Sequence, residues 1–456
     1  MDSITPGKND RREIFGWIMY DWANHAFFTL VLGVLIGKYV TSLVTQTVGE
    51  NGPVIVIGGN VLVTAKSLFS YSVGLSVFLQ IFFLPVLGSI ADYTHLKKTF
   101  LAFFCYLGAI SCALLFFVDG DHYFWGAALF IITNLGAGAS VVFFNSYLTD
   151  ITTENWRDKV SSWGFASGYS GGFLTLVFGL IFLTYSESFG ISTGYAVRIC
   201  FLAAGIWWGG FAIFTFIFLK TRVPSRSAPE DKHYIVAGFS ELKETFKELF
   251  ALKQTLRFLI AYLLYNDGIQ TVIAMSAVFL YEEVSNADGS KLKDANLFIA
   301  FLIAQIVAAI GSLIFERVAH ITNTKTAILV ALVIWSGIVI YGYGFLHTLT
   351  DAYFMSGAIG FVLGGSQALS RSLFSQMIPA GRESAFFGIY AISERGTSWL
   401  GPLVFGLVAQ LTNSYRPAIL TLIVFFVVGS LVLLFTNTNQ AIKDAGNVPP
   451  EDALAA

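Results

Sequence analysis

Two aspartates stand inside long apolar segments of this 456-residue chain, one in each half of the sequence. Asp21 lies in the segment 20–25, Tyr-Asp-Trp-Ala-Asn-His, and Asp267 lies in the segment 265–270, Tyr-Asn-Asp-Gly-Ile-Gln. A carboxylate inside hydrocarbon is costly, and such residues by default mark a route for ions or polar ligands. We therefore expect both acids to serve a pathway across a membrane.

Asp267 leads the candidates because polar side chains follow it at helical spacing. Gln270 and Thr271 share its face by i, i+3, i+4 spacing, and Asn266 lies one face over. At about 1.5 Å per residue, Asp267 lies roughly 16 Å into its segment, close to the midplane. A desolvated carboxyl there can load and release a proton as a cavity alternates between the two membrane faces. The alternative is a buried acid that is hydrogen-bonded to a neighbouring helix.

Glu394 and Arg395 form a second charged pair near the midplane. Adjacent residues point about 100° apart on a helix, so each side chain needs a partner other than its neighbour. The arginine fork suits a substrate carboxylate, and Glu394 suits an amine or a proton. The alternative is an ion pair with Asp267, or with another helix, that only fixes packing.

The first apolar segment has a polar face of its own, made by Asp21, Asn24 and His25. Because imidazole titrates near neutral pH, His25 is a candidate proton relay. The alternative is a structural histidine held by hydrogen bonds. Asp21 lies only about 10 Å inside its segment, so we expect it at a gate near one mouth of the pathway.

Three further polar residues stand toward the ends of their segments and are expected to border the substrate route: Asn145, Gln367 and Arg371. Arg371 is about three residues from a segment end, and an arginine so placed can instead snorkel to lipid phosphate.

The segments that position these residues are typical of membrane spans. The chain is 55% hydrophobic and 12% charged, with a mean hydropathy of +0.69, unlike a soluble domain. Stretches near 20 apolar residues, enough to cross a hydrocarbon core of about 30 Å, recur along it. The sequence therefore predicts an all-α integral membrane protein with twelve transmembrane helices, at 15–44, 68–91, 99–118, 123–148, 160–183, 195–219, 256–281, 297–315, 327–346, 352–374, 385–411 and 417–435.

The distribution of Lys and Arg predicts the orientation of these spans. Most basic residues outside the spans fall on the side of the termini, whereas Lys66, Lys291, Lys293 and Arg416 fall on the other side. By the positive-inside rule, both termini are expected in the cytoplasm. We expect the chain to reside in a bacterial cytoplasmic (inner) membrane.

A polar stretch after the sixth span divides the chain. We expect an N-terminal six-helix half at 1–219, a cytoplasmic linker at 220–255, a C-terminal six-helix half at 256–437 and a tail at 438–456. In the linker, apolar residues recur at helical spacing opposite charged ones, which predicts an amphipathic helix along the membrane surface. Faint repeats between the halves indicate a duplicated, pseudo-symmetric bundle around a central cavity.

Several motifs resemble a known family. The segment 88–98, Gly-Ser-Ile-Ala-Asp-Tyr-Thr-His-Leu-Lys-Lys, is similar to the loop signature between helices 2 and 3 of the major facilitator superfamily. Segments 20–24, 265–268, 365–372 and 381–383 resemble its vacuole-effluxer branch, and the resemblance runs along nearly the whole chain. It implies the major facilitator fold and, from the fungal autophagy-related members, release of amino acids. Helix 5 lacks the Gly-Pro dipeptide of the antiporter signature, so the motifs leave proton antiport open.

The resemblance also implies a conformational switch in the cytoplasmic loops, which would lock the ends of neighbouring helices without touching substrate. Its residues would be Gly88, Asp92, Lys97 and Lys98, and we expect Asp150, Arg157 and Arg382 to do similar work in other loops.

These observations favour a secondary transporter that moves a small polar metabolite by alternating access, with export of amino acids and proton coupling as finer expectations. The alternative is a transporter or flippase for a lipid-like amphiphile, which the 44 Phe residues and sparse charge would suit. A membrane-embedded enzyme is the third alternative, but scattered His and three Cys supply neither a nucleophile with its base nor a metal cluster. We expect no cofactor, no metal, no nucleic-acid partner, and a monomer surrounded by lipid.

Overall fold

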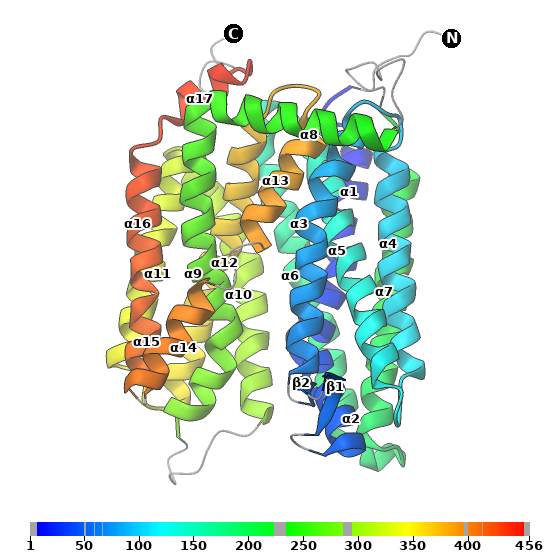
Figure 1. Cartoon of the computed structure of the whole chain (residues 1–456). Helices are drawn as coiled ribbons and strands as arrows, with labels where there is room; N and C mark the ends of the chain where they lie inside the picture. The colour runs from blue at the N-terminus through cyan, green and yellow to red at the C-terminus, as the bar shows by residue number, and fades with distance from the viewer. Residues whose placement is uncertain are drawn as a thin grey trace.

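Long helices make up most of the computed structural model, which describes residues 7–49, 52–58, 60–65, 67–222, 234–285, 294–395, 400–412 and 414–450. They form two groups that stand side by side (Figure 1). The start of α1 (Arg11–His25), the helix α8 (Tyr234–Ala251) and α17 (Thr438–Asp444) lie at one end, here named the linker end. A hairpin of β1 (Pro53–Ile57) and β2 (Asn60–Thr64) lies at the opposite end, named the hairpin end.

The first group comprises the helices up to Phe218. After α1 these are η1 (Ala26–Leu35), α2 (Ile36–Val48), α3 (Leu68–Asp92), α4 (Lys97–Leu114), η2 (Leu115–Phe117), α5 (Tyr123–Ile151), η3 (Glu154–Trp156), α6 (Arg157–Thr184), η4 (Glu187–Phe189) and α7 (Thr193–Phe218). The second group follows α8 and contains α9 (Lys253–Glu283), α10 (Asp294–Ile321), α11 (Thr324–Gly344), α12 (Leu349–Gln376), α13 (Glu383–Arg395), α14 (Leu400–Thr412), α15 (Tyr415–Thr421) and α16 (Ile423–Leu434).

The predicted membrane spans correspond to these helices. Ten helical stretches among the described residues are long and apolar enough to cross a membrane. The 28-residue α12, which packs along α10 and α11, occupies the tenth predicted span, and α13 with α14 occupies the eleventh. The all-α membrane architecture is therefore confirmed, with the small β hairpin as an addition that the sequence analysis did not predict.

The first span is longer than predicted. α1, η1 and α2 follow one another from Arg11 to Val48, and η1 is a π-helical segment. Apolar residues end near 44, yet the helix continues to Val48, and Val44 and Val48 both pack against the core of the first group. Helix 1 therefore extends beyond the hydrocarbon thickness of about 30 Å.

Short polar residues fix where several helices begin. The Ser192 hydroxyl accepts a hydrogen bond from the Tyr195 amide at the start of α7, and Thr348 with Asp351 forms a capping box on α12. These side chains satisfy backbone amides that have no partner inside the helix.

Each group of helices has its own apolar core. One cluster of buried residues runs from Ile14 to Leu219. The other runs from Leu249 to Ile442 and includes Leu84, Ala139 and Tyr169 from the first group. The two groups therefore pack as separate bundles that share an apolar seam, although the exact boundaries of the halves stay a prediction.

The helix α8 crosses the linker end of both groups (Figure 1). It packs against α3, α9 and α13. Leu249 is buried, Leu242 packs against Val86, Ile90 and Tyr93, and Phe250 is exposed. A helix with one buried apolar side is thus present where the linker pattern placed it.

Candidate functional site: a charged seam between the helix groups

Arg371 of α12 crosses from the second group of helices into the first. Its Nη1 donates to Asp21 Oδ2 at 3.2 Å and to Asn145 Oδ1 at 3.3 Å. Its Nε donates to the Ser161 hydroxyl at 2.9 Å, and its Nη2 donates to the Ser161 carbonyl at 2.8 Å. One guanidinium therefore joins α12 to α1, α5 and α6.

Aromatic rings enclose this guanidinium. Its Cζ lies 4.2 Å from the ring centre of Phe165 and 4.7 Å from that of Trp17, and Trp17 stacks on Phe144 with ring centres 4.4 Å apart. Rings at this range attract a cation through their negative faces. Gly164 allows the approach, because a Cβ there would lie 2.5 Å from Asp21 Oδ2.

The pair of Asp21 and Arg371 is deeply buried, with side chains 6% and 4% exposed. Arg371 therefore does not snorkel to lipid, because its fork is fully engaged inside the protein. Removing one partner of such a pair costs about 3–5 kcal/mol, since the other charge is left unpaired. Asp21 and Asn145 thus share one guanidinium, and the expected role of Asp21 as a gate stays a prediction.

Asn24 and His25 are next to this network but make local contacts. His25 Nδ1 lies 2.8 Å from the Asp21 carbonyl and 3.1 Å from Asn24 Oδ1, so Nδ1 carries the hydrogen when it donates to the carbonyl. The ring packs edge-on against Tyr169 at 5.3 Å and over Gly168. The contacts are those of a structural histidine, and the relay stays a prediction.

A second carboxylate, Asp92, joins the groups at the linker end. Its oxygens accept the backbone amides of Ser384 and Ala385, each at 2.8 Å, at the first turn of α13. An acid at a helix N-terminus satisfies amides that lack helical partners and favours the helix dipole. Gly88 makes the contact possible, because a Cβ there would lie 2.3 Å from the Ser384 carbonyl.

The other switch residues tie helix ends at the same level. Lys97 Nζ lies 3.0 Å from Asp150 Oδ2, and Lys98 donates to the Leu219 carbonyl at 2.5 Å, both within the first group. Arg157 reaches across, with Nη1 donating to the Ser375 carbonyl at 3.0 Å. These residues hold the linker ends of the helices together, and their role as a switch stays a prediction.

Arg382 binds residues of α8, the helix of the linker. The sequence analysis did not predict these partners. Its guanidinium contacts Glu241 at 2.5 Å, Glu248 at 3.2 Å and the Thr245 hydroxyl at 3.2 Å. The i, i+4, i+7 spacing of these α8 residues was the available signal, since it places them on one face. Glu241 and Glu248 of α8 therefore face Arg382 at the start of α13, whereas Lys243, Glu244 and Lys247 stay exposed.

Asp267 lies in the second group and contacts a different kind of partner. Its Oδ2 accepts the backbone amide of Gly401 in the first turn of α14 at 2.8 Å. The Thr271 hydroxyl donates to the Asp267 carbonyl at 2.7 Å, and a Cβ on Gly401 would lie 2.0 Å from Thr271 Oγ1. Asp267 is 1% exposed, and its Oδ1 has no hydrogen-bond partner among the described residues. The geometry is that of a buried acid bonded to a neighbouring helix.

The remaining predicted residues lie around these two centres. Gln270 is half-buried and contacts Asn266 at 3.4 Å, and Gln367 accepts from the Tyr169 hydroxyl at 3.2 Å across the seam. The side chains of Glu394 and Arg395 lie outside the described residues, so their expected roles stay predictions. Within the described part of the chain, no group of three or more His, Cys, Asp or Glu is placed to hold a metal ion.

Two bundles of membrane-spanning helices that meet along a buried polar seam define a transporter of the major facilitator class. Solved structures share the fold. A structure of the human organic anion transporter MFSD10 covers 94% of this chain and 100% of its own, with a TM-score of 0.63 and 14% identity. A structure of the major facilitator superfamily transporter FucP in the outward conformation covers 93% of this chain and 98% of its own, with a TM-score of 0.66 and 10% identity.

The chain belongs to the vacuole effluxer Atg22-like family, whose model matches residues 9–446. It is 30% identical over 423 residues to the uncharacterized MFS-type transporter YxiO of Bacillus subtilis, covering 92% of this chain and 93% of that protein. It is 25% identical to autophagy-related protein 22 of Yarrowia lipolytica, covering 82% and 76%. Both the family resemblance and the superfamily assignment made from the motifs are confirmed.

Proposed function

We propose that this protein is an alternating-access exporter of small polar metabolites, with amino acids as the substrate class. The observation that carries the proposal is the buried bond of Arg371 to Asp21, Asn145 and Ser161 across the two helix groups. An element that must form in one state and break in another is the physical requirement for alternating access. A buried ion pair can serve as such an element, because it holds the two helix groups together strongly while it is formed.

The linker end is the cytoplasmic end in this proposal. Its support is the excess of Lys and Arg on the side of the termini. Arg371, Asp92 and Arg157 bond the two groups toward that end. The conformation described here is then closed to the cytoplasm, and substrate passes when these bonds open.

Amino acids follow from the family. Membership of the vacuole effluxer Atg22-like family supports export, and the motif resemblance supports amino acids. The Arg371 site itself supplies a buried cation and a buried acid that are paired with each other. A zwitterion carries both charges and can compete for both members of this pair.

Asp267 is the proposed coupling acid. It is buried, and no ion pair among the described residues includes it. A carboxyl without a fixed cation partner can accept a proton without leaving a cation unpaired. Proton movement through Asp267 would then drive the exchange between states.

This proposal is tested with the purified protein in liposomes. Accumulation of each member of a metabolite panel is measured with and without an imposed pH gradient. We expect accumulation of amino acids that depends on the gradient. Movement of a fluorescent lysolipid without movement of any amino acid would replace the proposal with the amphiphile alternative.

A further inference from the structure

We propose a second, outer binding site for a zwitterion at the hairpin end, in a cavity of about 630 Å³ that is separate from the Arg371 seam. The inference deepens the proposed function, because it names where an amino acid sits as it leaves or enters on that side. The volume lies in the range of about 300–1,000 Å³ that is typical of small-molecule sites.

The cavity presents both signs of charge. Lys38 of α2, Arg198 of α7 and Asp119 all line it. Arg198 Nη1 contacts Asp119 Oδ2 at 2.6 Å, which fixes the position of that carboxylate. The Asp119 side chain is still 56% exposed, so its carboxylate can accept a further donor. In the proposed site a ligand ammonium binds Asp119 and a ligand carboxylate binds Lys38, whose side chain lines the same cavity.

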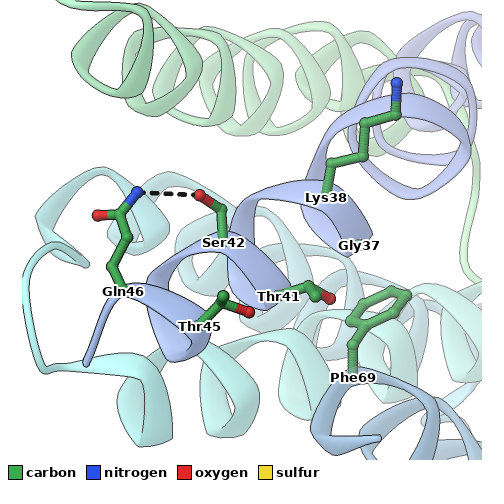
Figure 2. A pocket seen from close by; sticks show the side chains of 7 residues that line it. All are labelled: Gly37, Lys38, Thr41, Ser42, Thr45, Gln46 and Phe69. Atoms are coloured by element: carbon green, nitrogen blue, oxygen red, sulfur yellow. Dashed lines mark hydrogen bonds between the residues drawn. The ribbon is translucent and has the colours of Figure 1, made fainter. Parts of the chain in front are cut away.

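The polar side of α2 directs Lys38 to this cavity. Lys38, Ser42 and Gln46 follow i, i+4, i+8 spacing, and Gln46 donates to Ser42 at 3.1 Å. Figure 2 shows the side chain of Lys38 pointing away from Phe69, whose ring packs near Gly37 on the other side of the helix. This spacing brings Lys38, Ser42 and Gln46 to the cavity wall together.

Both helix groups build the cavity. Ala295 and Phe298 of α10 line it from the second group, whereas α2, α6 and α7 line it from the first. Apolar walls from Leu183 and Phe298 suit an aliphatic side chain next to the charges. Because the two groups move relative to each other during alternating access, the site changes shape with the transport state. A site with these properties holds substrate on the outer side of the seam.

The probe is L-leucine, compared with 4-methylpentanoate and isoamylamine, which keep its carbon chain and only one of its two charges. Equilibrium binding to the purified full-length protein in detergent is measured first. We expect saturable leucine binding, at least about tenfold weaker binding of each single-charge analogue, and a similar loss in Lys38→Gln and in Asp119→Asn, because each removes one charged hydrogen bond.

Lys38→Arg should retain leucine binding, which separates the loss of the charge from a loss of folding. Arg317→Gln is the matched control, because the Arg317 side chain is 80% exposed and is distant in sequence from Lys38 and Asp119. Transport in oriented liposomes is measured second. We expect Lys38→Gln to raise the half-saturating leucine concentration at the hairpin end only.

Unchanged leucine binding in both Lys38→Gln and Asp119→Asn, equal binding of the single-charge analogues, or no leucine binding by the unmodified protein would overturn the outer site. These results are independent of transport. Failure of every amino acid to cross the membrane would instead remove the proposed function, and binding that depends on Lys38 would keep the outer site.

Discussion

Asp21 and Asp267 stand at similar places in the two helix groups, yet their carboxylates bind different partners. Asp21 pairs with the guanidinium of Arg371 from the other group at 3.2 Å. Asp267 accepts one backbone amide from Gly401 in its own group at 2.8 Å. One acid therefore links the two helix groups, and the other links two helices within one group.

The difference in partners separates two kinds of work. Protonating Asp21 would leave Arg371 as a buried unpaired cation, so its charge must persist while the seam is closed. Protonating Asp267 leaves no such cation among the described residues. We infer that Asp21 belongs to the gate and that Asp267 is the acid suited to carry a proton.

The largest effect should follow from breaking the gate pair. Arg371→Gln should weaken the closed linker end by about 3–5 kcal/mol, because Asp21 is left buried without its cation. A cysteine introduced at Ala385, which is fully buried, should then react with an impermeant thiol reagent added at the linker end. The native Cys105, Cys112 and Cys200 are buried and should stay silent.

The double variant Asp21→Asn with Arg371→Gln is the companion of that test. Its closed linker end should be weakened by less than the sum of the losses in the two single variants, because no unpaired charge remains. Strictly additive effects would show that the two side chains do not act as a pair.

Two glycine substitutions should have intermediate effects that differ between the acids. A Cβ at Gly164 would lie 2.5 Å from Asp21 Oδ2, and one at Gly401 would lie 2.0 Å from Thr271 Oγ1. Overpacking of this kind typically costs about 1–3 kcal/mol. Gly164→Ala should increase thiol labelling at the linker end, whereas Gly401→Ala should lower thermal stability without opening it.

Gly74 and Gly406 provide matched controls, because a Cβ on either meets nothing within 4 Å. Their Ala variants should keep both labelling and stability. Equal thiol labelling of the Gly164→Ala and Gly401→Ala variants would show that the Asp21 contact between the groups and the Asp267 contact within one group do not differ in their effect on the linker end.

The smallest effect should come from an ion pair at the linker end that water reaches. Lys220 Nζ lies 2.7 Å from Asp10 Oδ2, and this hydrogen bond, with the Arg12 amide, lowers the pKa of Asp10. The lowered pKa adds stability above the unfolded value of about 3.9, which is lost as the pH falls through the folded value. Lys220→Gln should cost under about 1 kcal/mol at pH 7, and less in acid, by thermal unfolding. A larger loss of stability would show that solvent exposure does not make this ion pair weaker than the buried pair of Asp21 and Arg371.

The sequence predicted the helices well because an apolar run near 20 residues is a local property. It did not predict the extension of helix 1 to Val48, because the packing of Val48 against the core of the first group is a tertiary contact. The partner of Arg371 also depends on tertiary packing, since Asp21 lies 350 residues away. Sequence position placed Arg371 near a helix end, where snorkelling and a buried bond are equally compatible.

The amide partners of Asp92 and Asp267 were not predictable for another reason. Ser384, Ala385 and Gly401 contribute backbone groups, which every residue type possesses. Gly88 and Gly401 were the available signals, because a glycine allows close approach, but membrane helices contain many glycines.

Separate roles for Asp21 and Asp267 are tested most directly by transport in liposomes that contain Asp21→Asn or Asp267→Asn. Amino-acid counterflow at equal pH is compared with uptake driven by a pH gradient. We predict that Asp267→Asn keeps counterflow, because its amide oxygen still accepts the Gly401 amide, but loses the gradient-driven component. Asp21→Asn should lose both. Gradient-driven uptake at the unmodified level in Asp267→Asn, or normal counterflow in Asp21→Asn, would contradict these separate roles.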